Sequence, residues 1–435
     1  MSFKQLGISE PIIRALNLKG YTDATPIQKN CIPEIFAGKD MVASAQTGTG
    51  KTGAFTLPLI QRLNKYGPLE PKKVRSIILV PTRELAIQVH ENISQYSQFL
   101  SIKAGVAFGG QPLAQQIKAL EKGVHVLVVT PGRLMDLQKR KAIELDQVDV
   151  IVLDEADRLL ELGFQAQLGT ILAQLPKIRQ TLMFSATYGA KIKKLSEQWL
   201  NNEVRINTKA QNTVADNVTQ KAILCDKERK FELTAHLIKK NNWSQVLVFV
   251  RTKAGADELA DYLYDHKHGV SLSAASIHSD KTQAKRTSIL KKFKEGKIQV
   301  LVATDVAARG LDIKDLPAVI NVNLPFVKED YVHRIGRTGR AEAKGEAYTL
   351  ISADESELLD KIEVLLQKVV ERETIVEFRP RQPVAPTRLR LKYQPRDRTK
   401  KPGVRKSKGA TSKKDLAANN PYLMGLSKRA RKAVR

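Results

Sequence analysis

The stretch Asp40–Thr52, DMVASAQTGTGKT, joins a short apolar run to a glycine-rich segment that ends in Lys-Thr. Gly48 and Gly50 carry no Cβ, so backbone N–H groups beside them can approach the oxygens of a phosphate. Lys51 would then reach the β- and γ-phosphates of a nucleotide, and Thr52 would offer its hydroxyl to Mg²⁺ or its waters. The pattern predicts a phosphate-binding loop made of Ala45, Gln46, Thr47, Gly48, Thr49, Gly50, Lys51 and Thr52.

A second pattern places acids where such a loop needs them. Asp154-Glu155-Ala156-Asp157 directly follows the apolar run Val150–Leu153. The carboxyl ends of parallel strands are where α/β sheets bind their ligands. We expect Asp154 to hold the Mg²⁺ shell and Glu155 to position or deprotonate an attacking water.

Each pattern also has a simpler alternative. A chance glycine-rich loop would explain the glycines, but not a Lys-Thr pair after a strand, and Ala45 does replace the usual first glycine. An acidic helix N-terminus, favoured by the helix dipole, would explain Asp154 or Glu155 alone. The two patterns in one chain favour nucleotide chemistry over both alternatives.

Short runs rich in Val, Ile and Leu alternate with helical patterns over residues 1–378. This alternation predicts doubly wound α/β domains with parallel sheets, and both halves could share one fold. The polar segment Asn207–Asn217 separates two series of strands and is the expected interdomain linker, and a closing helix is expected around Asp354–Val370. The predicted strands are Asp40–Ser44, Ser76–Val80, Val124–Thr130, Val148–Leu153, Thr181–Phe184, Val246–Val250, Gln299–Ala303, Val319–Asn323 and Ala347–Ile351, and two of the predicted helices are Glu84–Phe99 and Ala254–Tyr264.

Positive charge is concentrated at the C-terminal end. The 435 residues carry 72 Lys+Arg against 45 Asp+Glu, a net charge of +27, and residues 379–435 alone hold nineteen bases and two acids. This segment has six prolines and few large apolar residues, so it is predicted to be a disordered tail. Its charge favours a polyanion such as RNA as partner. A merely solubilising tail is the alternative.

Composition narrows the remaining possibilities. The length suits two or three domains, and 42% hydrophobic residues exclude wholesale disorder. Cys31 and Cys225 lie far apart and fit neither a disulfide framework nor a zinc spacing. We expect no membrane-spanning segment, no secretory signal and a cytoplasmic location.

With these motifs in place, residues 1–378 resemble the DEAD-box RNA helicases of superfamily 2. The segment Gly20–Gln28 resembles that family's adenine-reading motif, with Ala24 where the family often has proline. The resemblance implies that Gln28 hydrogen-bonds the adenine edge and that Tyr21 stacks on its ring. It also implies two tandem RecA-like domains, with ATP and Mg²⁺ as cofactors.

The same resemblance assigns RNA contacts and coupling residues. Ser185-Ala186-Thr187 resembles the motif that couples hydrolysis to strand separation, and Asp157 is assigned to the same coupling. Ile277–Arg286 resembles an auxiliary RNA motif, with Ser279 replacing the usual glycine. The groups offered are N–H, hydroxyl and guanidinium donors, which suit phosphate and sugar rather than base edges. The implied RNA contacts are Pro81, Thr82, Arg83, Gly110, Thr130, Pro131, Gly132, Arg133, Arg251, Thr304 and Asp305.

The segment His333–Arg340, HRIGRTGR, is the most specific signal of the second half. Arg337 and Arg340 resemble arginine fingers that neutralise charge on the γ-phosphate. His333 is expected to link back to the acidic motif, and Asp312 to meet the ATP ribose. A solvated basic helix is the alternative, but two glycines interrupt it.

The resemblance implies an ATP-dependent RNA helicase that unwinds short RNA duplexes or remodels RNA–protein complexes. The implied divisions are an ATP-binding domain at 1–206, a linker at 207–217, a C-terminal helicase domain at 218–378 and a basic tail at 379–435. Two alternatives stay open, a DNA-dependent helicase and a nonenzymatic RNA chaperone acting through the tail. Met1–Gln28 and the basic tail look most like the bacterial RhlE-type subgroup, which would imply ribosome assembly or RNA turnover. The tail could also contact ribosomal precursors or RNA-decay proteins.

Overall fold

The computed structural model describes residues 1–387 apart from 46–47, 68, 209–217, 266–269, 309–310, 312, 314 and 340–344. We call residues 1–208 the first lobe and residues 218–387 the second lobe. Each lobe is built on a seven-stranded parallel sheet. No helix in the described residues is long and apolar enough to cross a membrane.

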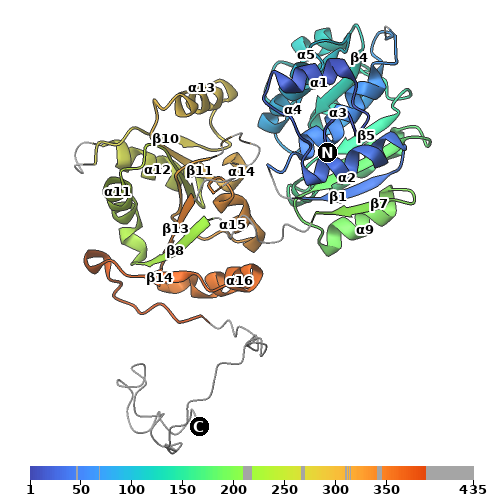
Figure 1. Ribbon diagram of the computed structural model, residues 1–435. Helices are drawn as coiled ribbons and strands as arrows, with labels where there is room; N and C mark the ends of the chain where they lie inside the picture. The colour runs from blue at the N-terminus through green and yellow to red at the C-terminus, as the bar shows by residue number, and fades with distance from the viewer. Residues whose placement is uncertain are drawn as a thin grey trace, which may run out of the picture. The chain divides into compact units, whose positions relative to one another are not determined.

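The first lobe arranges its strands in the order β3-β4-β2-β5-β6-β1-β7 (Figure 1). These strands are β1 (Met41–Ser44), β2 (Val74–Leu79), β3 (Ala104–Ala107), β4 (Val124–Val129), β5 (Val150–Leu153), β6 (Gln180–Ser185) and β7 (Val204–Asn207). The helices are α1 (Glu10–Asn17), α2 (Pro26–Phe36), α3 (Lys51–Leu63), α4 (Arg83–Tyr96), α5 (Leu113–Leu120), α6 (Pro131–Lys139), α7 (Ala156–Glu161), α8 (Gln165–Gln174) and α9 (Ala190–Trp199).

The second lobe repeats this topology in the order β10-β11-β9-β12-β13-β8-β14, which is the first order with each number raised by seven. Its strands are β8 (Val218–Leu224), β9 (Val246–Val250), β10 (Ala274–Ile277), β11 (Val300–Thr304), β12 (Ala318–Asn321), β13 (Gly345–Ile351) and β14 (Glu371–Glu373). Its α-helices are α11 (Lys230–Asn241), α12 (Lys253–Tyr264), α13 (Gln283–Lys294), α14 (Asp305–Ala308), α15 (Lys328–Ile335) and α16 (Ser356–Leu366), and its short 3₁₀ turns are η1 (Lys227–Arg229), η3 (Ala353–Glu355) and η4 (Val376–Phe378).

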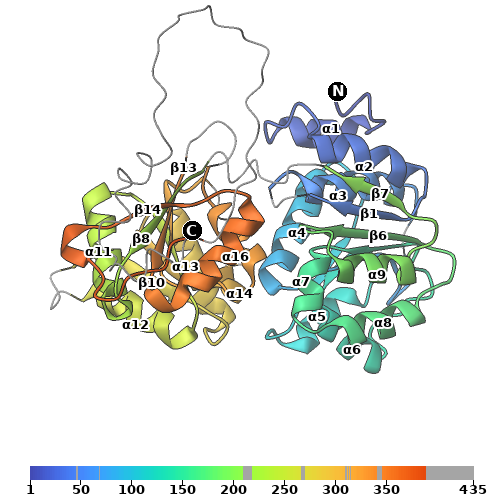
Figure 2. The ribbon, with the colours of Figure 1, turned by 90° about the horizontal axis from the view of Figure 1, so that it is seen from below.

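Both faces of the first sheet are buried. Along β2, Ile78 packs with α1–α4 on one face, whereas Ile77 and Leu79 pack with α5–α9 on the other. Figure 2 shows α1–α3 on one side of β1 and β6, with α8 and α9 on the opposite side. Double-sided burial explains why these strands are continuous apolar runs, and the predicted fold class is confirmed.

The ends of the predicted linker and tail differ from the prediction. Asn207 belongs to β7, and residues 209–217 of the predicted linker lie outside the described residues. Residues 379–387 contact the second lobe: the Arg381 N–H donates to Asp226 Oδ1 (3.0 Å), Arg372 donates to the Ala385 carbonyl, and Val384 packs on the core. Basic and proline-rich composition hid these contacts in the sequence. Residues 388–435 lie outside the described residues.

Candidate nucleotide and RNA site

Apart from the adenine-reading motif Gly20–Gln28, which lies between α1 and α2, the predicted motifs of the first lobe follow the carboxyl ends of its strands at one edge of the sheet. The nucleotide motifs follow β5, β6 and β1, which are neighbours, and the RNA motifs follow β3, β4 and β2, which are also neighbours. Strand order therefore divides this edge into a nucleotide half and an RNA half, although the residues of each half are far apart in the sequence.

The phosphate loop is packed directly against the adenine-reading motif. Gly48 and Gly50 have φ values of 85° and 97°, in the left-handed region that favours glycine. Gln28 Nε2 donates to the Gly50 carbonyl (3.1 Å), and a Cβ on Gly50 would lie 2.7 Å from that nitrogen. Gln28 Oε1 in turn accepts from the Thr25 N–H (2.9 Å). Gln28 thus ties the start of α2 to the loop, while Gln46 and Thr47 lie outside the described residues.

Sequence reasoning missed two residues of this contact. A Cβ on Gly50 would also lie 2.9 Å from Thr25 Oγ1, and a Cβ on Gly53 would lie 2.7 Å from Gln28 Nε2. Thr25 and Gln28 form a capping box at the start of α2, so the spacing Thr-x-x-Gln was the signal that could have revealed Thr25. Gly53 lies inside α3 and carried no signal of its own.

Replacing Gly50 with alanine is expected to weaken ATP binding by about tenfold or more, because the new Cβ must displace Gln28 and strains a left-handed residue. Gly38→Ala is the matched control, since Gly38 also has a positive φ (75°) but has nothing within 4 Å of its Cβ position. Titration of a fluorescent ATP analogue measures both variants. Equal affinities for the two variants would contradict the close approach as the cause.

Lys51 and the predicted metal ligands line one cavity of about 390 Å³. The Lys51 side chain is buried, and its Nζ donates to the Ser185 carbonyl at 3.2 Å. Ala45, also buried, donates its N–H to the same carbonyl (3.1 Å), which joins the loop to the end of β6. Thr49, inside the loop, is partly buried. The cavity is also lined by Tyr21, Gln28, Gly48, Gly50, Thr52, Asp154, Glu155, Leu311 and Arg337.

The two acids that follow β5 line this cavity; Asp154 is buried and Glu155 is partly buried. Burial raises the pKa of Asp154 to about 7, with the Lys51 ammonium opposing the rise. Burial also raises the pKa of Glu155, and Lys51, His333 and Arg337 oppose it. Glu155 has a φ of 48°, a left-handed conformation that is costly for a residue other than glycine. Placing the Glu155 carboxylate at the cavity therefore costs free energy of folding, through both backbone strain and desolvation.

Asp157 connects the acidic motif to the predicted coupling motif. Its Oδ2 accepts from the Ala186 N–H (3.1 Å), the Thr187 N–H (3.1 Å) and Thr187 Oγ1 (3.2 Å). Ser185 Oγ donates to the Thr187 carbonyl (2.7 Å), which closes the turn. A movement of the acids would therefore be transmitted to Ser185–Thr187 through direct hydrogen bonds.

The second lobe contributes groups at the same cavity. Arg337 lines the cavity, is buried, and donates from Nη1 to the Leu311 carbonyl (2.8 Å). Burial lowers the pKa of His333, against the opposing charges of Asp157 and Glu155. The predicted finger Arg340 and the predicted ribose contact Asp312 lie outside the described residues.

The RNA half of the first sheet holds its donors on tight loops. Thr82, which follows Pro81, caps α4 by accepting from the Leu85 N–H (3.2 Å). A Cβ on Gly110 would collide with the Arg83 guanidinium, and Gly110 has a φ of 80°. Glycine at this position therefore lets Arg83 lie against the backbone that follows β3.

Arg133 is used inside the fold rather than presented on its surface. Thr130 and Pro131 begin α6, and Arg133, after Gly132, is buried with a pKa that desolvation lowers. Its Nη1 donates to Gln116 Oε1 (2.8 Å) and its Nη2 to the Gln111 carbonyl (3.2 Å). Arg133 thus orients the loop of Gly109 and Gly110. Sequence reasoning missed Gln116, which also accepts from the Phe108 N–H (3.2 Å).

In the second lobe, the predicted RNA residues are joined to the helix that precedes the arginine fingers. Arg334, only 1% exposed, makes a bidentate ion pair with Asp305, with Nε–Oδ1 and Nη2–Oδ2 distances of 2.6 and 2.7 Å. Thr304 ends β11 directly before Asp305 and is buried. Arg251 follows β9 and lies over the Phe326 ring at 4.2 Å. A buried ion pair of Glu84 with Arg286 (2.9 Å) was also missed from the sequence.

Comparison with known proteins gives a consistent result. Residues 25–195 match the model of the DEAD/DEAH box helicase family, and residues 229–342 match the helicase conserved C-terminal domain. The DEAD-box ATP-dependent RNA helicase CshA of Bacillus cereus is 41% identical over 371 residues, 85% of this chain and 69% of the relative. CshA of Bacillus subtilis strain 168 is 41% identical over 372 residues, 86% of this chain and 74% of the relative.

Solved structures of RNA complexes share the fold of both lobes. S. cerevisiae Dbp5 bound to RNA and ADP BeF3 superposes with a TM-score of 0.75 at 28% identity, covering 87% of this chain and 95% of Dbp5. Mss116p bound to single-stranded RNA and AMP-PNP has a TM-score of 0.78 at 29% identity, covering 86% of this chain and 80% of the other. The two lobes are therefore tandem RecA-like domains.

A phosphate loop and two acids of one such lobe, with Arg337 of the other at the same cavity, define a nucleotide hydrolase of the helicase type. The chain belongs to the DEAD-box ATP-dependent RNA helicases, and it is an RNA-dependent ATPase. This family membership confirms the resemblance drawn from the motifs.

Proposed function

We propose that the cavity at the carboxyl edge of the first sheet binds ATP with Mg²⁺. Lys51 would contact the β- and γ-phosphates, Tyr21 and Gln28 the adenine, and Asp312 the ribose. The cavity, which is lined by an ammonium, a hydroxyl and two carboxylates, supports this assignment.

The residues at this cavity fit Mg²⁺. Thr52 would offer a hydroxyl and Asp154 a carboxylate, directly or through water. Among the described residues no group of three His, Cys, Asp or Glu side chains could hold a metal ion. One carboxylate is what Mg²⁺ commonly takes when substrate phosphates and waters complete its shell. Bound there, the ion would neutralise phosphate charge.

Glu155 is proposed to orient and deprotonate the attacking water, and Arg337 and Arg340 to stabilise charge on the γ-phosphate. His333 and Asp157 would connect these groups to Ser185 and Thr187. Because the catalytic residues come from both lobes, closure of the lobes on ATP and RNA would complete the site.

The RNA is proposed to be held by its backbone, largely independently of sequence. It would lie along the RNA half of the first sheet and at the ends of β9 and β11 in the second. Contacts would come from the eleven residues named in the sequence analysis, with Arg133 acting by orienting the loop of Gly110. Closure would bend the bound strand, which then suits a duplex poorly, so the partner strand is released. RNA-stimulated ATPase measured with matched RNA and DNA tests this, and equal stimulation by DNA would favour a DNA-dependent helicase instead.

We propose a cytoplasmic role in ribosome assembly or RNA turnover, and membership of the RhlE-type subgroup. The basic C-terminal segment supports this proposal, and it would contact ribosomal precursors or RNA-decay proteins and add an RNA-annealing activity. Crosslinking of a hydrolysis-deficient Glu155→Gln protein to cellular RNA tests the role. Recovery of no ribosomal precursor or messenger RNA would contradict it.

Binding of ATP with Mg²⁺ is expected to release about one proton near pH 6 and almost none above pH 8, because a cation favours the ionised form of Asp154. Burial raises the pKa of Asp154 to about 7 in the protein without nucleotide. Below that pH the carboxyl is protonated before binding and must ionise. Calorimetry in buffers of different ionisation enthalpy measures the release. Asp154→Asn should abolish it, and unchanged release in that variant would refute the assignment.

Removing residues 388–435 is expected to weaken RNA binding and to flatten its salt dependence, since the segment holds seventeen bases and two acids. The cut after Thr387 keeps the contacts of residues 379–387 with the second lobe. ATP hydrolysis at saturating RNA should be unchanged. RNA affinity over a range of salt concentrations measures the effect, and a segment of equal length with neutral residues is the control. Loss of hydrolysis at saturating RNA would show that the segment belongs to the catalytic core.

A further inference from the structure

A buried carboxylate in the second lobe joins two cations that lie on different elements. Glu355 ends η3, directly before α16, and its residue is only 3% exposed. Its Oε2 accepts from the Lys230 ammonium, and its Oε1 accepts from Arg251 Nη2 (3.2 Å). No motif of the sequence analysis includes Glu355 or Lys230, whereas Arg251 is a proposed RNA contact.

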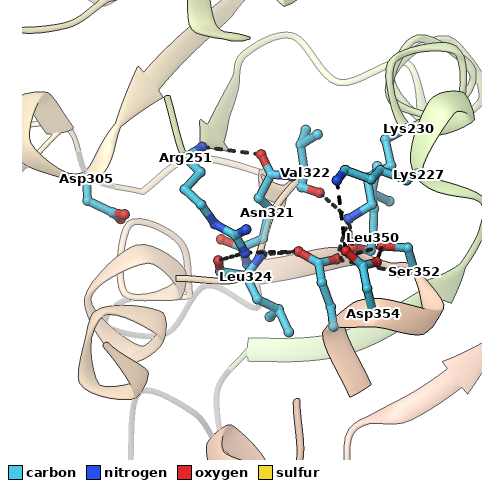
Figure 3. A network of polar contacts seen from close by, with 12 residues as sticks. Lys227, Lys230, Arg251, Asp305, Asn321, Val322, Leu324, Leu350, Ser352 and Asp354 are labelled. Atoms are coloured by element: carbon cyan, nitrogen blue, oxygen red, sulfur yellow. Dashed lines mark hydrogen bonds and ion pairs between the residues drawn. The ribbon is translucent and has the colours of Figure 1, made fainter. Parts of the chain in front are cut away.

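Lys230 has no donor left for any other partner. Its residue is 2% exposed, and besides Glu355 its Nζ donates to the Val322 carbonyl (2.8 Å) and the Leu350 carbonyl (2.8 Å). Three bonds use all three ammonium protons. Figure 3 shows Lys230 and Arg251 reaching this network from different parts of the lobe. Lys230 therefore acts on the fold and on Glu355, not on RNA or nucleotide.

The network holds Arg251 and the loop between β12 and α15 together. Glu355 Oε1 also accepts from the Leu324 N–H (3.2 Å), and Arg251 Nη2 donates to the Leu324 carbonyl (2.9 Å). The same loop carries Phe326, on which Arg251 lies, and it leads into α15 with His333 and Arg334. Glu355 thus holds Arg251 Nη2 and the loop backbone with a single carboxyl oxygen.

The charges of this network do not cancel, and the positive charge left over is that of Arg251. Lys230 and Glu355 neutralise each other in the interior, where both are desolvated. Arg251 adds a second positive charge that the single carboxylate does not cancel, and its side chain is 28% exposed. A guanidinium held at Nη2 and supported on one face by Phe326 keeps its charge but loses rotational freedom, which lowers the entropy cost of binding a phosphate.

We infer that Glu355, with its partner Lys230, is a positioning residue that fixes Arg251 for contact with the RNA backbone. The inference rests on the proposed RNA role of Arg251. Loss of Glu355 and Lys230 should therefore change the affinity for RNA but not the ATP hydrolysis step, because the nucleotide cavity contains neither residue.

Variants of the full chain that remove the pair together avoid leaving one buried charge without its partner. Lys230→Met with Glu355→Leu, the Met/Leu pair, removes the carboxylate acceptor of Arg251 and leaves only the Leu324 carbonyl for its Nη2. Lys230→Met with Glu355→Gln, the Met/Gln pair, keeps one side-chain oxygen that can accept from Arg251 Nη2. Glu363→Gln is the matched control, because Glu363 is a fully buried carboxylate of α16 that accepts from the Val370 N–H (3.0 Å) and has no bond to Arg251.

The readouts are the RNA concentration for half-maximal ATPase, kcat at saturating RNA, KM for ATP and the thermal midpoint. The Met/Leu pair is expected to raise the half-saturating RNA concentration about tenfold, with kcat and KM for ATP unchanged. The Met/Gln pair should recover most of the loss, and the control should resemble the parent chain. Arg251→Met should raise the same concentration, and adding the Met/Leu pair to Arg251→Met should cause no further rise, because Glu355 acts through Arg251.

Three results would overturn the inference. If Arg251→Met weakens RNA binding but the folded Met/Leu pair does not, Arg251 contacts RNA without help from Glu355. If the effects of Arg251→Met and the Met/Leu pair multiply, Glu355 acts by another route. An Arg251→Met variant with unchanged half-saturating RNA would instead refute the proposed RNA role of Arg251, and this inference with it.

Discussion

Glu155→Gln is expected to lower RNA-stimulated ATP turnover by about 10²- to 10⁴-fold, while ATP and RNA still bind. The glutamine keeps the shape of the side chain and can still accept a hydrogen bond, but it cannot take a proton from water. Glu155 lies in the cavity with Lys51 and Thr52, at the place where a γ-phosphate would be held by the loop. Steady-state ATPase assays and equilibrium binding of nucleotide measure the two properties separately.

The same variant should be more stable than the parent chain without ligand at neutral and alkaline pH. Burial raises the pKa of Glu155, so ionisation of this group in the folded state costs stability as pH rises through that pKa. Glutamine removes this cost.

Glu161→Gln is the control for turnover, because Glu161 lies on the adjoining α7 and pairs with Arg158 (2.9 Å). Turnover at the parent rate in Glu155→Gln would refute the role of Glu155 as the general base.

The central strands of both sheets could be predicted from sequence, but some outer strands could not. Val246–Val250 was predicted with the bounds that the structure has, since a run of buried Val, Leu and Phe is a strong signal. β3 (Ala104–Ala107) and β10 (Ala274–Ile277) were missed because each is short, rich in small residues and at the end of its sheet. Their pairing with β4 and β11 makes them strands, and that pairing is not local.

In the candidate site too, contiguous motifs could be predicted, whereas contacts between residues distant in the sequence could not. A loop such as Gly48–Thr52 is contiguous, so its residue types and spacing are visible in the sequence. The partner of a given side chain is not visible. Arg133 was predicted to offer donors to RNA, yet its guanidinium bonds to Gln111 and Gln116 within the fold. Nothing local indicates that Glu355 would hold Arg251, because folding alone brings the two together.

Arg337→Ala is expected to have the largest effect of all, a loss of about 10³- to 10⁵-fold in RNA-stimulated hydrolysis. Arg337 belongs to the second lobe, whereas the phosphate loop belongs to the first, so ATP affinity of the resting protein should change little. Its Nη1 already donates to the Leu311 carbonyl (2.8 Å), which fixes the side chain at the cavity before nucleotide arrives. Rapid-quench measurement of a single turnover, with and without RNA, separates chemistry from product release.

Substitution by lysine distinguishes charge from geometry at this position. Arg337→Lys keeps the positive charge, but an ammonium cannot bond the Leu311 carbonyl and also present a planar pair of donors to phosphate oxygens. It should therefore remain far below the parent rate. Arg372→Ala is the matched control, because Arg372 is also in the second lobe and mostly buried, with Glu363 at 3.8 Å. If Arg337→Ala retains RNA-stimulated hydrolysis within threefold of this control, the charge on the γ-phosphate must be neutralised elsewhere, and Arg340 alone would be the arginine finger.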